Sequence, residues 1–260
     1  MLAIWRTARW LIALAVIGFW LWLLGQQLAM PPMKHGVPFY EWYGDWDDVV
    51  LVSAVFLAFV LTLAWPRGKA QWRNAGIYSA FLISLFFEMF GLPLTIFLLS
   101  PLVNVEIVDF GSGESHLWAY ALYRAGVWPL GVGVHVVMTV SMALIALGMA
   151  LLAVGWAQVF GARHELMARG IYRFVRHPQY LGLILILIAF NIQWPTLLTL
   201  VMAPLLIVAY VRQARREDAE LKARFGEEFT RYAARVPAFI PALRRRGAVR
   251  PPVASAELSR

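Results

Sequence analysis

Long apolar stretches alternate with short polar connections along the chain, a pattern typical of a polytopic helical membrane protein. The hydrocarbon of a bilayer is about 30 Å thick, so a spanning helix needs about 20 mostly apolar residues. Four stretches reach that length: Trp10–Ala29, Val49–Trp65, Ala75–Leu102 and Val127–Phe160. The first is longer than the apolar core of a signal peptide, so we expect it to be an uncleaved span.

A fifth apolar stretch, Tyr180–Val211, is interrupted by Asn191, Gln193 and Pro195. Proline has no amide proton and disfavours helix at the residue before it, and polar side chains are costly at the bilayer centre. We therefore expect two helices joined by a tight turn. The predicted fold is all-α, a polytopic bundle of about six spans that ends in a helical hairpin.

Composition supports this fold, and charge gives it an orientation. The chain is 61% hydrophobic, well above the 45–50% or so of soluble domains. With both termini inside, the inner segments hold 21 of the 23 Lys and Arg residues. Basic residues favour the cytoplasmic side, so we expect cytoplasmic termini in a bacterial inner membrane. The attraction of basic residues to anionic membrane lipids then accounts for the net charge of +8, which gives no reason to expect nucleic acid as a partner.

The organisation expected from these patterns has three parts. Residues 1–160 form a four-span region, residues 161–243 a C-terminal core, and residues 244–260 a basic, disordered tail. Within the core, four apolar residues recur at spacings of four, four and three: Leu221, Phe225, Phe229 and Tyr232. That spacing predicts an amphipathic helix over Glu217–Arg235, lying at the cytoplasmic interface.

Two polar clusters lie on either side of the hairpin. Arg176-His177-Pro178-Gln179-Tyr180-Leu181-Gly182 precedes it, and Arg215-Arg216-Glu217-Asp218 follows it. Because a hairpin returns to its starting side, both clusters should meet at one membrane face and form a polar pocket. Simpler interpretations exist for each residue: a helix cap for His177, a lipid anchor for Arg176, an interfacial aromatic for Tyr180 and a surface ion pair for Glu217. None of these explains the whole ordered set.

Together with Gly170-Ile171-Tyr172, Phe225-Gly226, Tyr232 and Val236-Pro237-Ala238-Phe239-Ile240-Pro241, these clusters resemble the isoprenylcysteine carboxyl methyltransferase and phospholipid methyltransferase superfamily. Methanethiol S-methyltransferases look like relatives. The resemblance covers roughly Leu166–Pro241 and implies methyl transfer from S-adenosylmethionine at the cytoplasmic face. It implies that the cofactor pocket includes Tyr172, Arg176, His177, Tyr180, Gly182, Glu217 and Asp218. Two positions depart from the family pattern: Ile171 replaces a proline, and Asp218 replaces the second glutamate.

The chemistry of these residues agrees with that cofactor. Acidic side chains such as Glu217 suit its cationic groups and hydroxyls, and Arg176 suits its carboxylate. Aromatic faces stabilise a sulfonium, and Gly182 permits close backbone approach.

Two polar residues lie within predicted spans and are candidates for a catalytic role beside His177. Glu88 is near the middle of its span, where a carboxylate is costly and usually functional, and Gly91 and Pro93 should kink the helix nearby. His135 lies in the next span, nearer the outer face. Glu88 could line the substrate cavity as a base or anchor, or could be a protonated structural residue.

The expected acceptor is small and apolar or lipid-like, bearing a thiol, a carboxylate or an amine. One alternative is a non-catalytic membrane accessory protein of the NnrU type; another is a sterol-reductase-like enzyme, which would need a nicotinamide site. The five histidines lack the spacing of a metal pair and there is no cysteine, so we predict no metal site. The oligomeric state is left open.

Overall fold

The computed structural model describes residues 2–30, 44–64, 69–99, 101–102, 116–159 and 165–240, and the predicted disordered tail lies outside them. These ranges contain helices and no strand, which confirms the all-α fold class. The helices are α1 (Leu2–Ala29), α2 (Trp46–Ala64), α3 (Lys69–Phe86), the π-helical η2 (Phe87–Gly91), α4 (Leu94–Leu99), α6 (Leu117–Arg124), α7 (Leu130–Val159), the 3₁₀-helical η3 (Gly170–Arg173), α8 (Pro178–Gln193) and α9 (Leu197–Arg235).

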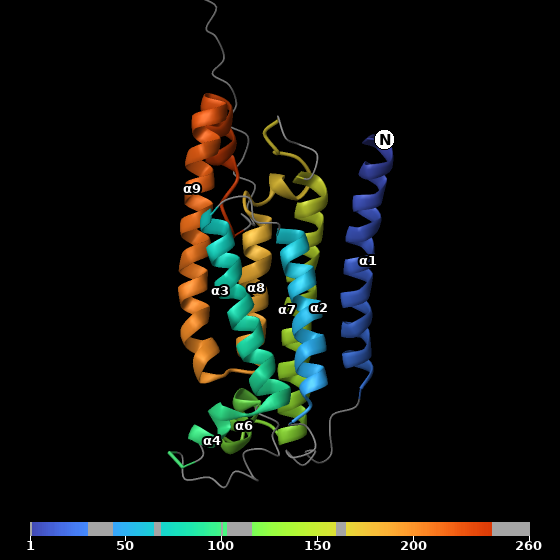
Figure 1. Ribbon diagram of the computed structural model, residues 1–260, viewed down its shortest axis with the longest axis vertical. Helices are drawn as coiled ribbons and strands as arrows, with labels where there is room; N and C mark the ends of the chain where they lie inside the picture. The colour runs from blue at the N-terminus through green and yellow to red at the C-terminus, as the bar shows by residue number, and fades with distance from the viewer. Residues whose placement is uncertain are drawn as a thin grey trace, which may run out of the picture.

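Five of the described helices are long and apolar enough to cross a membrane: α1, α2, α3 with η2, α7 and α9. Helix α8 is apolar but has 16 residues, about 24 Å of helix, which is shorter than the hydrocarbon layer. It runs along the bundle beside the others (Figure 1). The chain is thus a polytopic helical membrane protein with the expected C-terminal hairpin.

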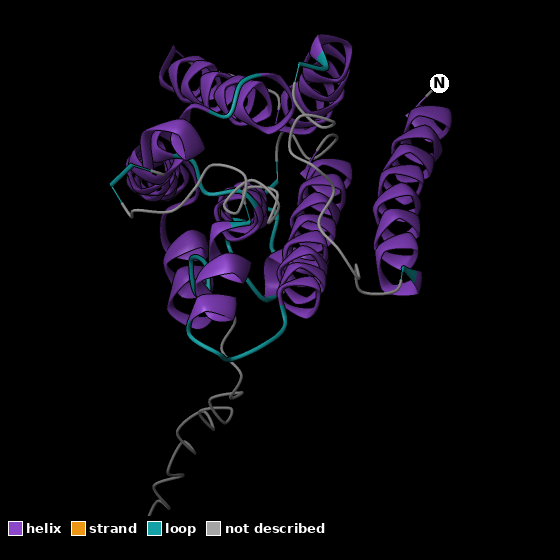
Figure 2. Ribbon diagram, turned by 90° about the horizontal axis from the view of Figure 1, so that it is seen from below, coloured by secondary structure: helices purple, strands orange, loops and turns teal. Residues whose placement is uncertain are grey.

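The helices run roughly parallel to one axis, so the molecule has two ends (Figure 1). We call the end that holds Arg176 and His177 the motif end, and the end that holds the α8–α9 turn the turn end. The start of α1 and the last part of α9 both lie at the motif end. Seen along the bundle, α1 stands at one edge (Figure 2), where it packs against α7.

Helices α7 and α8 pack closely against each other, and two glycines make this possible. A Cβ added at Gly182 would lie 2.6 Å from the carbonyl oxygen of Gly148, and a Cβ added at Gly148 would lie 2.7 Å from the carbonyl oxygen of Gly182. No side chain fits between backbones this close. Gly182 therefore permits close backbone approach, but the neighbour it approaches is α7, whereas the sequence predicted the cofactor.

The hairpin turn forms where the sequence predicts it. Helix α8 ends at Gln193, and α9 begins after Thr196, whose hydroxyl accepts a hydrogen bond from the Thr199 amide at 3.1 Å. This N-cap satisfies an amide that the first turn of a helix leaves without a partner. The turn also contacts α4, because the Leu197 amide donates to Thr95 Oγ1 at 2.9 Å.

The predicted span Ala75–Leu102 is not one helix. Helix α3 widens into η2, the chain is extended at Leu92, and α4 follows as a separate short helix. The break lies at Gly91 and Pro93, as expected, because proline cannot continue the hydrogen-bonding pattern. Glu88 therefore lies near the turn end of α3 and not at the bilayer midplane, which corrects that prediction.

Helix α9 does not continue straight to its end. Gly226 has φ 54° and ψ −122°, a conformation that breaks the helix. In a straight helix Asp218 and Val236 would be about 27 Å apart, yet Arg176 binds both. The segment after Gly226 therefore folds back toward the motif end of α8, where Figure 1 shows it beside α9. We call residues 227–240 the C-terminal arm.

This reversal corrects the prediction of one amphipathic helix over Glu217–Arg235. The four apolar residues do belong to one cluster, completed by Leu166, Ala168, Ala233 and Val236. They come from both sides of the bend, and the cluster packs against protein, with Phe229 and Tyr232 buried.

Candidate functional site

The segment before α8 is held by the C-terminal arm. The amides of Arg176 and His177 donate to the carbonyl oxygens of Pro237 and Ala238 at 2.9 and 3.1 Å. Pro178 then starts α8 at its first helical positions, where the missing amide proton costs nothing. His177 makes no capping bond with its side chain, which excludes the helix-cap interpretation and leaves the imidazole for other contacts.

Asp218 binds two side chains of this segment. Its Oδ1 lies 2.8 Å from His177 Nε2, and its Oδ2 accepts from Arg176 Nη2 at 2.8 Å. An ionised carboxylate can only accept hydrogen bonds, so Nε2 of His177 carries a proton. Asp218 therefore fixes the orientation of the imidazole and leaves its Nδ1 facing Glu217, whose Oε2 is 3.7 Å away.

Glu217 is the centre of a second set of hydrogen bonds. Its Oε1 accepts from Tyr180 Oη at 2.5 Å and from Gln71 Nε2 at 2.8 Å. Gln71 also lies 3.4 Å from Tyr180 Oη. The carboxylate is thus held by one residue from α3 and one from α8, while its side chain keeps 30% of its surface exposed.

Aromatic rings surround these polar groups. Tyr180 stacks on Tyr210 with ring centroids 5.6 Å apart, and the His177 ring lies 5.9 Å from both Tyr180 and Phe239. Such rings exclude water and present negative faces to a bound cation.

The two carboxyl groups differ in pKa because they differ in surroundings. Both follow the apolar part of α9, which ends at Val211 and is succeeded by arginines, so they lie beyond its membrane-spanning part. Burial raises the pKa of the Glu217 carboxyl, and the bonds from Tyr180 and Gln71 and the nearby His177 offset this only in part. Burial acts in the same direction on Asp218, but the bonds from His177 and Arg176 outweigh it and lower its pKa.

Five of the predicted pocket residues meet in this site: Arg176, His177, Tyr180, Glu217 and Asp218. The arginine also has a structural role that the sequence did not predict. Its Nη1 donates to the carbonyl oxygens of Ala233 and Val236 at 3.0 and 2.6 Å, and its Nη2 is on Asp218. These bonds use Nη1 and Nη2 to hold the C-terminal arm, while Nε has no hydrogen-bond partner among the described residues.

Tyr172 and Gly182 are not part of this site. Tyr172 is buried in η3, where its carbonyl oxygen accepts from Tyr232 Oη at 2.6 Å. Gly182 faces Gly148 of α7. Both residues position the elements that carry the site, and neither contacts Glu217 or Asp218 through a described hydrogen bond.

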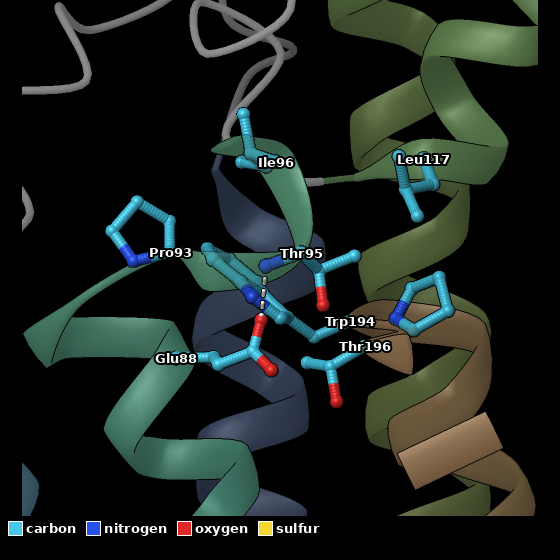
Figure 3. Close-up of a pocket in the computed structure, with 8 residues that line it drawn as sticks. Glu88, Pro93, Thr95, Ile96, Leu117, Trp194 and Thr196 are labelled. Carbon is cyan, nitrogen blue, oxygen red and sulfur yellow. Dashed lines mark hydrogen bonds between the residues drawn. The ribbon is translucent and has the colours of Figure 1, made fainter. Parts of the chain in front are cut away.

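Glu88 and His135 are also separate from the site. Glu88 is buried at the turn end, where its Oε2 accepts from the Thr95 amide at 2.8 Å (Figure 3). It lines a small pocket with Trp194, Pro195 and Thr196 from the α8–α9 turn. The length of α8, about 24 Å, separates it from His177. His135 is near the turn end of α7, and no described hydrogen bond joins it to Glu88. The structure thus brings neither of these two predicted catalytic residues to His177, and their catalytic role stays a prediction.

A buried histidine that the sequence did not single out lies at the same end. His116 Nδ1 is 2.9 Å from the carbonyl oxygen of Gln193, and its ring contacts Trp194 edge-on. Burial lowers the pKa of His116 to about 4, so it is neutral at physiological pH. Its contacts fix the end of α8.

Sequence reasoning missed Gln71 as a site residue. It lies in the region without recognisable motifs and reaches the site only because α3 packs against α9. Its position at the polar start of an apolar helix is the only signal in the sequence, and many residues share that signal. Phe239 was part of the resemblance but was not assigned to the pocket.

Two comparisons with known proteins bear on this geometry. Residues 128–228 match the model of the phospholipid methyltransferase family. The match includes α8 and the polar clusters on both sides of the hairpin, while Gln71 and Phe239 lie outside it. No curated protein matches the chain. Over residues 128–228, which include the packed hairpin, this polytopic membrane protein is therefore similar to the phospholipid methyltransferase family, part of the wider superfamily that includes the isoprenylcysteine carboxyl methyltransferases.

Proposed function

We propose that this protein transfers the methyl group of S-adenosylmethionine to a small apolar or lipid-like acceptor at the motif end of the bundle, and that this end is cytoplasmic. The observation that carries the proposal is the Glu217 carboxylate, held by Tyr180 and Gln71 and placed 3.7 Å from His177 Nδ1. The 21 basic residues on the inner side support the cytoplasmic assignment.

The site fits the cationic part of the cofactor. Glu217 provides an anionic group with exposed surface, and Tyr180, Tyr210 and Phe239 provide aromatic faces. A carboxylate and aromatic rings together stabilise an ammonium or sulfonium group. When bound, S-adenosylmethionine supplies an electrophilic methyl group, which passes to the acceptor while the sulfur keeps the bonding electrons as a neutral thioether.

The residues of the chain would contribute position and proton transfer. Asp218 holds the His177 ring through Nε2, which leaves Nδ1 facing Glu217 and the space beside it. From there it can take the proton that a thiol or amine acceptor loses. Aromatic walls and the C-terminal arm exclude water, which strengthens the interaction between Glu217 and a cation.

Calorimetric binding of S-adenosylmethionine to the detergent-purified protein tests the proposal. We expect saturable binding by the wild type and at least tenfold weaker binding by Glu217→Ala, because a buried charge pair is worth more than about 1.4 kcal/mol. Glu228→Ala is the matched control, since Glu228 is an exposed acid on the C-terminal arm. Absence of binding by folded wild type would refute the methyltransferase and favour the accessory-protein alternative.

A further inference from the structure

Helices α3 and α9 pack antiparallel in a register that two contacts define. Gln71 bonds to Glu217, and seven residues further along α3 the ring of Tyr78 lies 6.1 Å from that of Tyr210, seven residues back along α9. One further layer of residues along the helix axes therefore lies between these two contacts. It contains Asn74 of α3 and the neighbouring residues Gln213 and Ala214 of α9.

Helix geometry places both amides on the same flank of this pair. Each residue turns an α-helix by about 100°, so Asn74 lies about 60° from Gln71 around α3, and Gln213 lies about 60° from Tyr210 around α9. Because the helices are antiparallel, equal rotations on the two helices lead to the same side. Asn74 is part of the buried stripe of α3, so that side is the bundle interior.

The two amides are buried without hydrogen bonds. Asn74 is 5% exposed and Gln213 is 9% exposed, and neither side chain has a hydrogen-bond partner among the described residues. Polar groups in buried residues are nearly always bonded, so two amides without a protein partner at one level mark a place where another molecule can bond to them. The amide atoms of Asn74 and Gln213 are not among the fully enclosed side-chain atoms that lack a partner in the described residues. Each amide group therefore keeps a small accessible surface.

We propose that Asn74 and Gln213 form an amide layer that binds the head group of the methyl acceptor, and that this head group is uncharged and able to hydrogen bond. This inference rests on the proposed function. The layer lies about one helical turn, 5.4 Å or so, from Glu217 on the side of the apolar spans. An acceptor dissolved in the hydrocarbon reaches it before it reaches the carboxylate.

The chemistry of the layer selects the class of acceptor. Each amide offers donors and an acceptor oxygen but no charge, which suits a thiol, a hydroxyl or a carbonyl group. The charged residues nearest in sequence, Arg73 and Arg212, are both exposed. A carboxylate head would be desolvated there without a counter-charge, and the one carboxylate close enough to serve an ammonium head, Glu217, is already held by Tyr180 and Gln71 and pairs with the cofactor in the proposed function.

A series of four amphiphiles with one chain length separates these possibilities. Decanethiol, decanol, decanoate and decylammonium are titrated at about pH 8, where the last two are charged, into wild type, Asn74→Leu and Gln213→Leu. Binding is read from the concentration dependence of the unfolding temperature in one detergent. Calorimetry measures the affinity for S-adenosylmethionine in the same samples. Ser79→Ala is the control, because among the described residues the Ser79 hydroxyl bonds only to its own helix at Ala75.

We expect the wild type to bind the thiol and the alcohol about tenfold more tightly than the charged heads, and each Leu variant to lose that preference. Cofactor affinity should stay within about twofold of the wild-type value in both variants. The Leu variants should unfold at the same or a higher temperature, since an unpaired buried amide is removed. The Ser79→Ala control should bind like the wild type.

The inference would be overturned if the wild type bound all four amphiphiles equally tightly. It would also be overturned if both Leu variants kept the preference of the wild type for uncharged head groups. Loss of cofactor binding with acceptor binding unchanged would also overturn it, because the layer would then belong to the cofactor. A wild type that fails to bind S-adenosylmethionine but selects neutral heads through Asn74 and Gln213 would refute the proposed function while supporting the amide layer.

Discussion

Gln71 of α3 donates a hydrogen bond to Glu217 of α9 at 2.8 Å, across 146 residues of sequence. The carboxylate belongs to the segment that matches the methyltransferase family, and the amide does not. The N-terminal spans therefore contribute a side chain to the site in addition to surrounding the hairpin.

Replacing Gln71 by alanine should weaken cofactor binding without unfolding the protein. One hydrogen bond to a charged group contributes about 1.5–3 kcal/mol, so we expect a roughly tenfold or larger rise in Kd for S-adenosylmethionine. Ile77→Ala, an exposed position on the same helix, should leave the Kd unchanged. An unchanged Kd in Gln71→Ala would show that Tyr180 alone holds Glu217.

Arg176 should behave as a structural residue that holds the C-terminal arm. In Arg176→Lys the single ammonium cannot reach Asp218 and two carbonyl oxygens at once, so about 1.5–3 kcal/mol of stability should be lost. The arm should then become sensitive to limited proteolysis after Gly226, which mass spectrometry of the fragments detects. If Arg176→Lys kept normal protease resistance but lost cofactor binding, we would conclude that Arg176 binds the cofactor carboxylate.

The α7–α8 contact should not tolerate a methyl group. In Gly182→Ala the new Cβ would meet the Gly148 carbonyl oxygen at 2.6 Å, and separating the helices should cost about 1–3 kcal/mol. Gly76→Ala is the matched control, because nothing lies within 4 Å of its added Cβ and alanine favours a helix by about 0.5–1 kcal/mol. A lower unfolding temperature in Gly182→Ala and a higher one in Gly76→Ala, each relative to the wild type, would confirm the contact. Equal unfolding temperatures in the two variants would contradict it.

Cofactor affinity should depend on pH through Glu217. Its pKa is raised, so the carboxylate that attracts the cation is lost at a higher pH than for an ordinary glutamate. The Kd should rise as pH falls through that pKa, by up to about tenfold per pH unit. Glu217→Gln should bind weakly with a flat pH profile. A wild-type profile that is flat down to the ordinary carboxyl range would contradict the role of Glu217.

Glu88 should affect stability and not cofactor binding. Glu88→Ala leaves the Thr95 amide without its acceptor and should cost about 1–3 kcal/mol, seen as a lower unfolding temperature. The Kd for S-adenosylmethionine should be unchanged, because α8 separates the two ends of the bundle. A large rise in Kd would show that the ends communicate.

The sequence determined the bundle and most of the polar cluster. Apolar stretches longer than the hydrocarbon predicted the long spans, and Pro195 with its polar neighbours predicted the hairpin turn. A hairpin returns its ends to one side, so His177, Tyr180, Glu217 and Asp218 were expected to meet. These inferences rest on local properties, namely length, polarity and the missing amide of proline.

Tertiary structure decided which partner each residue has. The positive φ of Gly226 turns the C-terminal arm back, and this reversal places two carbonyl oxygens on Arg176, so that its guanidinium holds the arm. The register of α3 against α9 brings Gln71 to Glu217 and sets Asn74 level with Gln213. No local pattern encodes such pairings, because they depend on how the side chains of several helices pack together at once.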